Sequence, residues 1–599
     1  MKTINLSSLD GSNGFRLDGE VAHDLFGISV SNAGDVNGDG FDDVIVGAFG
    51  ADPNGLSSGS SYVVFGKASG FSANFDLSTL NGNNGFRLDG VAAHDFSGRS
   101  VSNAGDVNGD GFDDLIVGAY GANPNGDSSG SSYVVFGKAS GFSATMELSS
   151  LDGSDGFRLD GMTAGDSSGW PVSNAGDVNG DGFDDVIIGA HYAGPNGHSS
   201  GSSYVVFGKA SGFSATMDLS SLDGSNGFRL DGREENDFSG LSVSTASDVN
   251  GDGFDDVIVG AIGAHYAGPN GNWSGSSYVV FGKASGFSAT MEMSSLDGSN
   301  GFRLDGIAEN NYSGYSVSTA GDVNGDGFDD VIVGASRASP NGNESGSSYV
   351  VFGKASGFSA TMELSSLDGS NGFRLDGVSA GDLTGRSVSN AGDVNGDGFD
   401  DLIVGAPRAD LNGEESGSSY IIFGRSDFGS DVDFPGTAGD DELTGTKAAE
   451  RFEAGAGNDK MIGRGGADVF YGEAGDDYIR VSDLNFQWAD GGAGRDTLGL
   501  GGKGLNLDLA GVNGRISDIE TIYLYGTGDN TLTLTALDVV NLSSTSNVLR
   551  VNGNEGDHIV GLSNGWDDGG IHGKFHTYTQ GEAVLLVGVN VATDFPNIV

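Results

Sequence analysis

The chain has 599 residues, of which 108 are Gly, 9 are Pro and none is Cys. Its 28 Lys and Arg against 83 Asp and Glu give a formal net charge of −55, which argues against nucleic acid as a partner because phosphate binding needs a basic surface. The absence of Cys excludes disulfides and thiolate metal sites. No apolar run of about 18 residues is present to span a membrane, and we expect no cleaved secretory signal.

Six near-identical repeats fill residues 1–428. The nonapeptide DVNGDGFDD recurs every 71 residues, once every 74, and is followed each time by apolar runs such as VIVGA, YVVFG and FRLDG. These short runs, bounded by Gly and Ser, predict about four β-strands per repeat. Six such units predict an all-β protein with a six-bladed β-propeller, and a seven-bladed ring is the alternative.

The two ends of the repeat region predict closure of the ring. The segment 7–19 repeats the text of a fourth strand, whereas the sixth repeat stops after its third strand, residues 420–424. We therefore expect the N-terminal strand to complete the last blade and to remove two free sheet edges.

The text SVSNAGDVNGDGFDDVIVGA followed by YVVFG resembles the FG-GAP repeat, the blade of integrin α-subunit propellers and of many bacterial secreted proteins. The resemblance covers roughly 70% of the chain. Integrin propellers have seven somewhat shorter blades, so the resemblance implies the type of blade and leaves the number of blades open.

Each acidic loop offers oxygen atoms at alternate positions, as calcium prefers. Positions 1, 3, 5 and 9 supply side chains, and the Phe at position 7 supplies its carbonyl. Position 12 of the first loop is Val46 rather than Glu, which excludes an EF-hand, whereas the calcium loop of FG-GAP blades fits. A plain turn needs fewer acids. Position 8, Asp42 in the first loop, is expected to face solvent or to contact the next blade.

The expected propeller ligands are Asp35, Asn37, Asp39, Phe41 and Asp43; Asp106, Asn108, Asp110, Phe112 and Asp114; Asp177, Asn179, Asp181, Phe183 and Asp185; Asp248, Asn250, Asp252, Phe254 and Asp256; Asp322, Asn324, Asp326, Phe328 and Asp330; and Asp393, Asn395, Asp397, Phe399 and Asp401.

A second acidic pattern begins at residue 436. Acidic residues recur with a period of nine, each followed two places later by an apolar residue such as Phe452 or Phe470. The segment GAGNDKMIGRGGADVFYG resembles the RTX nonapeptide repeat, which implies a parallel β-roll over residues 429–499 with calcium between turns. The expected ligands are Asp441, Asp459, Asp468 and Asp477. The turn of Glu450 lacks internal glycines, and GGAGRDTLG around Asp496 is out of register by one residue.

Residues 500–599 alternate apolar and polar positions and resemble the C-terminal region that follows RTX repeats in large bacterial adhesins. This resemblance implies a β-rich region with an export signal, as in type I secretion, and an extracellular protein that folds where calcium is abundant.

No motif predicts a catalytic site. GxSxG strings such as residues 126–130 follow from the Gly and Ser content and do not lie on a strand-to-helix turn. His572 and His576 lack the helix and glutamate of a zinc protease. Carboxylate pairs of glycosidase type stay an open alternative.

The repeats differ most in the loops after FRLDG and after VGA. In FG-GAP propellers these loops lie opposite the calcium loops, on the face where integrins bind ligand. Aromatic and Arg side chains there are typical interface anchors, although loops also drift without function. They are Trp170, His191, Tyr192, Arg233, Trp273, Tyr312, Tyr315, Arg337 and Arg408.

The leading hypothesis is a secreted or cell-surface bacterial calcium-binding protein, not an enzyme. Its propeller would bind an unknown protein or glycan ligand on the face opposite the calcium loops. The alternatives are a secreted hydrolase that uses the propeller as a scaffold, and a structural matrix or surface-layer protein.

Overall fold

The computed structural model describes residues 15–68, 71–264, 270–410, 416–425, 434–512, 515–543 and 546–596. The chain forms two compact units, Met1–Gly429 and Ser430–Val599, each described here by itself. Among the described residues, no helix is long and apolar enough to cross a membrane.

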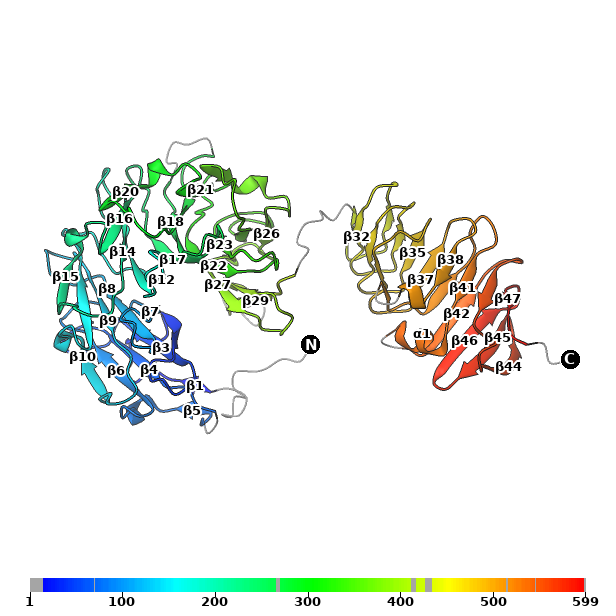
Figure 1. The fold of residues 1–599 in the computed structure, drawn as a ribbon, viewed down its shortest axis with the longest axis horizontal. Helices are drawn as coiled ribbons and strands as arrows, with labels where there is room; N and C mark the ends of the chain where they lie inside the picture. The colour runs from blue at the N-terminus through cyan, green and yellow to red at the C-terminus, as the bar shows by residue number, and fades with distance from the viewer. Residues whose placement is uncertain are drawn as a thin grey trace. The chain divides into compact units, whose positions relative to one another are not determined.

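The first unit is a six-bladed β-propeller whose sheets follow one another around a central axis (Figure 1). The blades consist of β2 (Val30–Gly34), β3 (Asp43–Ala48), β4 (Ser60–Val64), β6 (Gly85–Asp89) and β10 (Thr145–Glu147); β7 (Ser100–Gly105), β8 (Asp114–Ala119), β9 (Ser131–Val135), β11 (Gly156–Asp160) and β15 (Thr216–Asp218); β12 (Val172–Gly176), β13 (Asp185–Ala190), β14 (Ser202–Val206), β16 (Gly227–Asp231) and β20 (Thr290–Glu292); β17 (Ser242–Ser247), β18 (Asp256–Ala261), β19 (Ser276–Val280), β21 (Gly301–Asp305) and β25 (Thr361–Glu363); β22 (Ser316–Gly321), β23 (Asp330–Ala335), β24 (Ser347–Val351) and β26 (Gly372–Asp376); and β27 (Ser387–Gly392), β28 (Asp401–Ala406) and β29 (Ser418–Ile422).

Apolar side chains between neighbouring blades form the core of the propeller. Ile45 and Val63 of the first blade pack with Leu115 and Val117 of the second, and the same arrangement repeats around the arc. The strands are short and apolar on both faces because each sheet is buried between two others.

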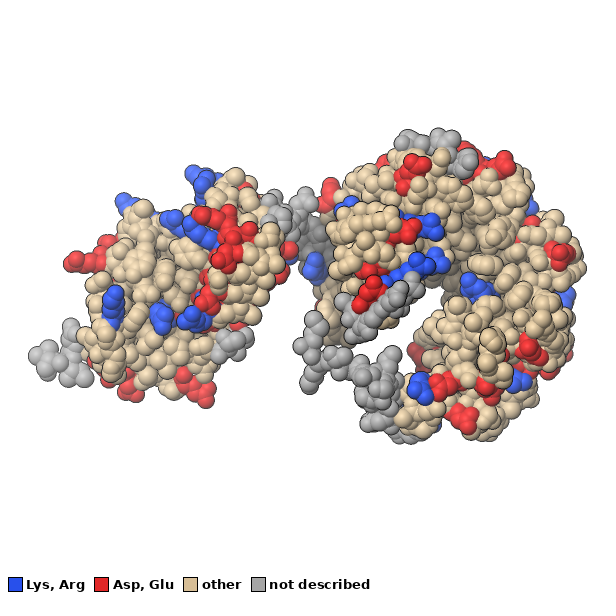
Figure 2. Space-filling view, turned by 180° about the vertical axis from the view of Figure 1, so that it is seen from behind, with Lys and Arg blue, Asp and Glu red and all other residues tan. Residues whose placement is uncertain are grey.

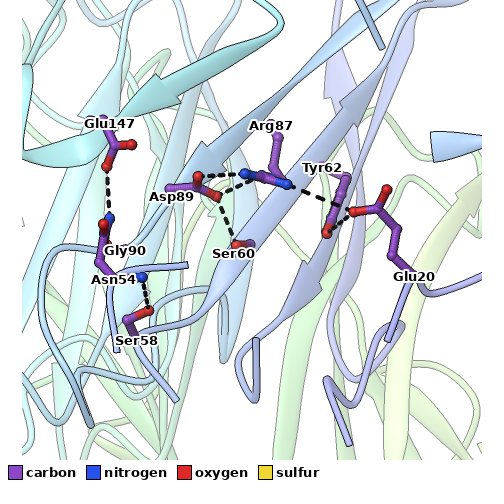
Figure 3. Close-up of polar contacts among 9 residues, drawn as sticks. All are labelled: Glu20, Asn54, Ser58, Ser60, Tyr62, Arg87, Asp89, Gly90 and Glu147. Carbon is purple, nitrogen blue, oxygen red and sulfur yellow. Dashed lines mark hydrogen bonds and ion pairs between the residues drawn. The ribbon is translucent and has the colours of Figure 1, made fainter. Parts of the chain in front are cut away.

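The outer part of each blade carries an ion pair between the Arg and the Asp of the FRLDG sequence. Arg87 contacts Asp89 at 2.7 Å, and Asp89 also accepts from the hydroxyl of Ser60 at 2.9 Å (Figure 3). Asn54 donates to Glu147 at 2.7 Å across 93 residues of sequence. These polar contacts fix the outer strands of the blade in register.

The expected closure by the N-terminal strand is not formed within the described residues, and residues 7–14 of that strand lie outside them. β1 (Arg16–Leu17) pairs with β5 (Asn74–Phe75), as fourth and fifth strands do in the other blades, but it does not pair with β29. The two faces at this seam stay exposed: Val30 is 66% exposed and its counterpart Val101 only 5%. Across the seam, Ile421 is 45% exposed and its counterpart Val350 is fully buried. The sixth blade is thus divided into a three-stranded and a two-stranded sheet.

The second unit is a parallel β-roll that continues beyond residue 500. One sheet contains β30 (Phe434–Pro435), β32 (Arg451–Glu453), β34 (Val469–Tyr471), β36 (Trp488–Asp490) and β39 (Ile516–Ser517). The facing sheet contains β31 (Glu442–Thr444), β33 (Lys460–Ile462), β35 (Tyr478–Val481), β37 (Thr497–Leu500), β40 (Thr521–Tyr523), β42 (Val548–Asn552), β46 (Ala583–Gly588), β45 (Phe575–Gln580) and β44 (Asp567–His572). A third sheet contains β38 (Asn506–Asp508), β41 (Thr531–Thr533), β43 (His558–Val560) and β47 (Ala592–Thr593), and α1 (Ala536–Asn541) is the one α-helix within the described residues.

The apolar residues of the nonapeptides fill the interior of this roll. Phe434, Phe452 and Phe470 stack at ring distances of 4.7 and 4.8 Å. The nine-stranded sheet crosses the expected boundary at residues 499 and 500, so the roll and the C-terminal region form one unit rather than two domains.

Candidate functional site

The six acidic loops connect the first and second strands of each blade. In the first loop Asp35 accepts from the backbone N–H groups of Asp39 and Gly40 at 3.0 and 2.9 Å. Asp43 is the first residue of β3 and accepts from the N–H groups of Val36 and Gly66 at 3.2 and 2.8 Å. These bonds tie the carboxylate at position 1 to the backbone of positions 5 and 6, and the carboxylate at position 9 to the backbone of position 2, and the other five copies repeat them.

The carboxylate at position 9 is buried beside two other acids. Burial is the main cause that raises the pKa of Asp43 to about 7; the N–H of Gly66 opposes it, and Asp39 and Asp35 add to it. The same causes raise the pKa of Asp114 to about 8 and that of Asp256 to about 9. A buried carboxylate among like charges is unstable without a positive partner, which is what a bound cation supplies.

Position 8 links neighbouring blades, one of the two roles that the sequence left open. Asp113 of the second blade accepts from the backbone N–H of Asp35 at 2.7 Å. The four following blade pairs repeat the bond at 2.7–3.2 Å. The Phe at position 7 adds to this contact: the ring of Phe112 lies against Gly38 and leaves no room there for a side chain. Each of the first five acidic loops is therefore held by the next blade.

The sixth loop differs because of the open seam. Val394, at position 2, is 58% exposed, whereas the equivalent valines of the other five loops are buried. The sixth loop keeps its internal bonds, with Asp393 accepting from the N–H of Gly398 at 2.9 Å.

The roll aligns its acids in a ladder. The N–H of Asp441 donates to Asp459 at 2.7 Å, that of Asp459 to Asp477 at 2.7 Å, and that of Asp477 to Asp496 at 2.8 Å. The Oδ2 atoms of Asp459, Asp477 and Asp496 are buried and have no hydrogen-bond partner within the described part of the chain. Each of these residues thus presents a carboxylate oxygen that lacks a positive or donor partner.

Other acids of the roll are already engaged. Asp441 accepts from the N–H and hydroxyl of Thr437, and Glu450 accepts from those of Thr446, at 2.6–3.0 Å. Asp468 is buried and accepts from the N–H of Glu450 at 3.1 Å.

Two acids of the ladder were missed in the sequence. Asp496 lies in the same column as Asp477 despite the extra residue between them, and the N–H of Asp496 donates to Glu520 at 2.8 Å. The GGAGRDTLG text was a usable signal for Asp496, whereas no periodic text marks Glu520.

The donor chemistry fits calcium. All the side-chain ligands are oxygen atoms, which favours a hard cation over a transition metal. Within the described ranges, no three His, Asp or Glu side chains converge as a metal cluster on their own. The loop pattern, with an Asn at position 3 and a carbonyl at position 7, predicts that amide and backbone oxygen atoms share the coordination of each ion.

A continuous row of aromatic rings lies at the opposite ends of the blades. Because each acidic loop joins the first two strands, the residues before the first strand and after the second lie at the other end of the sheet. We call these rings the aromatic belt. They are Phe49, Phe96, Tyr120, Trp170, His191, Tyr192, Phe238, Trp273 and Tyr312, each with its ring centroid 4.0–6.1 Å from the next.

The belt contains five of the residues singled out from the sequence, and Phe49, Phe96, Tyr120 and Phe238 were missed. Their signal is an aromatic residue at one of two loop positions in each repeat. Four of the belt residues have positive φ angles of 53–59°: Phe96, Phe238, Trp273 and Tyr312. Bulky residues in this region cost about 1 kcal/mol each, and such strain is common at functional positions.

Two of the three expected arginines, Arg337 and Arg408, lie near the end of the belt. Arg337 covers the ring of Tyr312 at 4.6 Å, and Tyr315 is covered by Arg386 at 3.9 Å. Arg408 lines the same pocket as Arg337. Arg233 is half-buried in its loop and takes no part in the belt contacts described above.

Comparison with known proteins identifies both repeat types. The FG-GAP repeat matches residues 26–64, 97–135, 169–206, 239–280, 313–351 and 378–422. The RTX calcium-binding nonapeptide repeat matches residues 444–479. The chain therefore carries six FG-GAP repeats and an RTX region, and calcium is the metal ion of the RTX repeats.

Similar proteins include integrin α chains and one enzyme. Integrin alpha pat-2 of Caenorhabditis elegans is 31% identical over 255 residues, 40% of this chain and 18% of that protein. Integrin alpha-PS5 of Drosophila melanogaster is 32% identical over 183 residues, 30% of this chain and 16% of that protein. Phosphatidylinositol-glycan-specific phospholipase D of Dictyostelium discoideum is 26% identical over 352 residues, 55% of this chain and 34% of that protein. The chain spans about a third or less of the length of these relatives.

Proposed function

We propose that this protein is an extracellular, calcium-dependent adhesion protein whose propeller binds a ligand without catalysis through the aromatic belt. The observation that carries the proposal is the continuity of the belt across five blades. Near-identical repeats have no structural need for different aromatic side chains at these loop positions, whereas an interface uses aromatic anchors.

The proposed calcium ligands are the six loop sets and the ladder of the roll. In the propeller, the ion would hold positions 1, 3, 5, 7 and 9 of each loop; in the roll, Asp459, Asp477 and Asp496 would direct their free Oδ2 atoms at ions between turns. Calcium supplies the positive charge, and the chain's own residues fix the loop at one end of the blade while the belt lies at the other.

The relation to integrin α chains supports an adhesive role, and the resemblance of the RTX region to exported proteins supports an extracellular location. The phospholipase D relative supports a different candidate, a secreted hydrolase. A test must therefore measure turnover as well as binding.

The test uses an array of glycans and proteins, probed with the full chain in calcium and in EGTA. We expect calcium-dependent binding without product formation. Trp170→Ala and Trp273→Ala should reduce binding at least tenfold at an unchanged melting temperature, whereas Tyr525→Ala, an exposed ring of the second unit, should not. Product release from a bound glycan or phosphodiester would overturn the non-catalytic proposal.

A further inference from the structure

A cavity in the fifth blade is lined by a tyrosine and an arginine that the other blades repeat. The cavity has a volume of about 680 Å³ and is lined by residues of two loops, 307–311 and 337–344. Tyr349 of β24 and Arg374 of β26 complete the lining from paired positions of adjacent strands. Each of the first five blades carries this Tyr–Arg pair in the same register. The other blades therefore show what the pair can bind.

In the first blade the pair holds a carboxylate of the chain itself. The hydroxyl of Tyr62 donates to Glu20 at 3.0 Å, and Nη1 of Arg87 lies 3.7 Å from the same oxygen (Figure 3). Glu20 occupies this place although two further acids, Asp24 and Asp52, lie close by. A Tyr–Arg pair of this propeller thus accepts a glutamate side chain even where other acids are near.

In the next three blades an aspartate from the loop after FRLDG lies near the pair. In each of them burial is the main cause that raises the pKa of the tyrosine, and the charge of the aspartate is the next: Asp95 for Tyr133, Asp166 for Tyr204 and Asp237 for Tyr278. These blades therefore supply a carboxylate of their own to the pair.

The fifth blade has neither of these acids. Asn311 stands where the other five repeats have Asp, and Ile307 stands at the position of Glu20. Burial raises the pKa of Tyr349 to about 12, and the charge of Arg374 opposes the rise. The two loop positions from which a carboxylate reaches the pair in other blades are thus neutral here.

Two other acids line the cavity. Glu344 lies 3.7 Å from Arg337, and both side chains are accessible, at 35% and 48%, so this ion pair is weak. Glu309 is exposed, and its Cβ and Cγ atoms lie beside Gly271 of the neighbouring loop. On the propeller face that Figure 2 displays, basic side chains likewise lie beside acidic ones. An acidic ligand is therefore selected by the placement of the donors and not by a net positive charge.

We propose that this cavity binds the side-chain carboxylate of a glutamate from a polypeptide partner. The hydroxyl of Tyr349 donates to the carboxylate and the guanidinium of Arg374 supplies the charge, a charge-assisted arrangement that favours an anionic acceptor. Arg374 keeps its bond to Asp376, 2.7 Å long, as its counterpart in the first blade does. The chain's own example, Glu20, is a glutamate on a polypeptide segment, which favours a peptide over a sugar carboxylate. The cavity has the volume of a small-ligand site.

The cavity adjoins the aromatic belt, because Arg337 in its lining covers the ring of Tyr312 at 4.6 Å. The inference rests on the proposed function in that both place the ligand at this end of the blades, and it adds the chemical class of the partner. A peptide too short to follow the belt tests the cavity by itself.

The test measures binding to the full chain in calcium by fluorescence anisotropy. The probes are a labelled Gly-Gly-Glu-Gly-Gly peptide, blocked at both ends, and its Gly-Gly-Gln-Gly-Gly counterpart. We expect the Glu peptide to bind at least tenfold more tightly than the Gln peptide, with an affinity that falls as salt screens the charges. Digalacturonate should compete at least tenfold less well than the unlabelled Glu peptide.

Variants locate the site. Asn311→Asp restores the acid of the other five repeats and should weaken binding of the Glu peptide at least tenfold at an unchanged melting temperature. Arg374→Gln should weaken it by a similar factor. Ser140→Asp is the matched control, because it adds the same charge at an exposed bend of the second blade, and it should change binding less than twofold. Trp273→Ala should also leave binding of this short peptide within twofold.

Equal binding of the Glu and Gln peptides, or binding that Asn311→Asp leaves unchanged, would overturn the cavity as a carboxylate site. Competition by digalacturonate at lower concentrations than the Glu peptide would overturn the polypeptide as ligand. Absence of peptide binding would overturn this inference, whereas the array with the Trp variants decides the proposed function.

Discussion

Replacement of Asp477 by Asn should change stability in opposite directions with and without calcium. The side chain is 2% exposed, its Oδ1 accepts from the N–H of Asp459 at 2.7 Å, and its Oδ2 has no partner among the described residues. Asn keeps the volume and an oxygen for the N–H of Asp459, but it removes the negative charge. Without calcium that buried charge destabilises the roll, whereas with calcium we expect it to bind the ion.

The magnitude follows from the cost of the buried charge. Burial, opposed by the N–H of Asp459 and reinforced by the charges of Asp459 and Asp476, raises the pKa of Asp477 from 3.8 to about 6. A shift of about two units corresponds to about 3 kcal/mol, which partial solvent screening reduces to about 2 kcal/mol. In chelator at neutral pH, D477N should therefore raise the unfolding free energy of the roll by about 2 kcal/mol. In calcium it should lower it by at least about 1.4 kcal/mol, a tenfold loss of affinity at that turn.

The assay is urea unfolding of the full chain, followed by hydrogen exchange in peptides of residues 459–500, in EGTA and in millimolar calcium. Asp567→Asn is the control, because Asp567 is an exposed acid of β44 in the same unit. A loss of stability of equal size in both conditions would refute the reasoning, since Asp477 would then act only as a hydrogen-bond acceptor.

Three further outcomes follow from the structure. Burial lowers the pKa of His191 from 6.5 to about 4. Between these two values the unfolded chain binds a proton that the folded chain does not, so the unfolding free energy falls as the pH drops from 6.5 toward 4. In urea unfolding, the propeller should lose about 2 kcal/mol more between pH 7 and pH 5 than the His191→Gln variant loses. Calcium removal should unfold residues 436–500 before the propeller strands, and equal exchange protection of both in EGTA would contradict this. Because β1 does not pair with β29, Leu17→Cys with Ser419→Cys should stay reduced under mild oxidation, and an intramolecular disulfide between them would show that the ring closes in solution.

The strands and blades were predictable because their signal is local. Runs such as Val44–Ile45–Val46 are apolar, β-branched and bounded by turn residues, and the repeat shows which runs are equivalent. Calcium follows from the same text, since the FG-GAP and RTX repeats were recognised from their residues. The individual calcium ligands in the loops stay predictions that metal-binding measurements must test.

The parts that could not be predicted depend on contacts between repeats. Nothing within one loop indicates that Asp113 bonds to the N–H of Asp35, 78 residues away. Asp496 lies in the ladder because the segment between β35 and β36 contains one extra residue. A strict period of nine does not allow for such an insertion. The aromatic belt likewise arises only when the variable loops of successive blades lie side by side.

Both units use the same local device, with different consequences for how strongly calcium is needed. In each, an acidic residue donates its backbone N–H to a carboxylate of the next repeat: Asp35 to Asp113 between blades, and Asp459 to Asp477 between turns. In the roll, the acids stand on neighbouring parallel strands about 4.8 Å apart, a distance at which two like charges repel by about 3 kcal/mol in a protein-like medium. In the propeller, Ile45, Val63 and Leu115 fill the space between the blades and hold them together by burial rather than by the ion. We therefore expect calcium to contribute more to the folding free energy of the roll than to that of the propeller, where it would fix the loops of blades that are already packed.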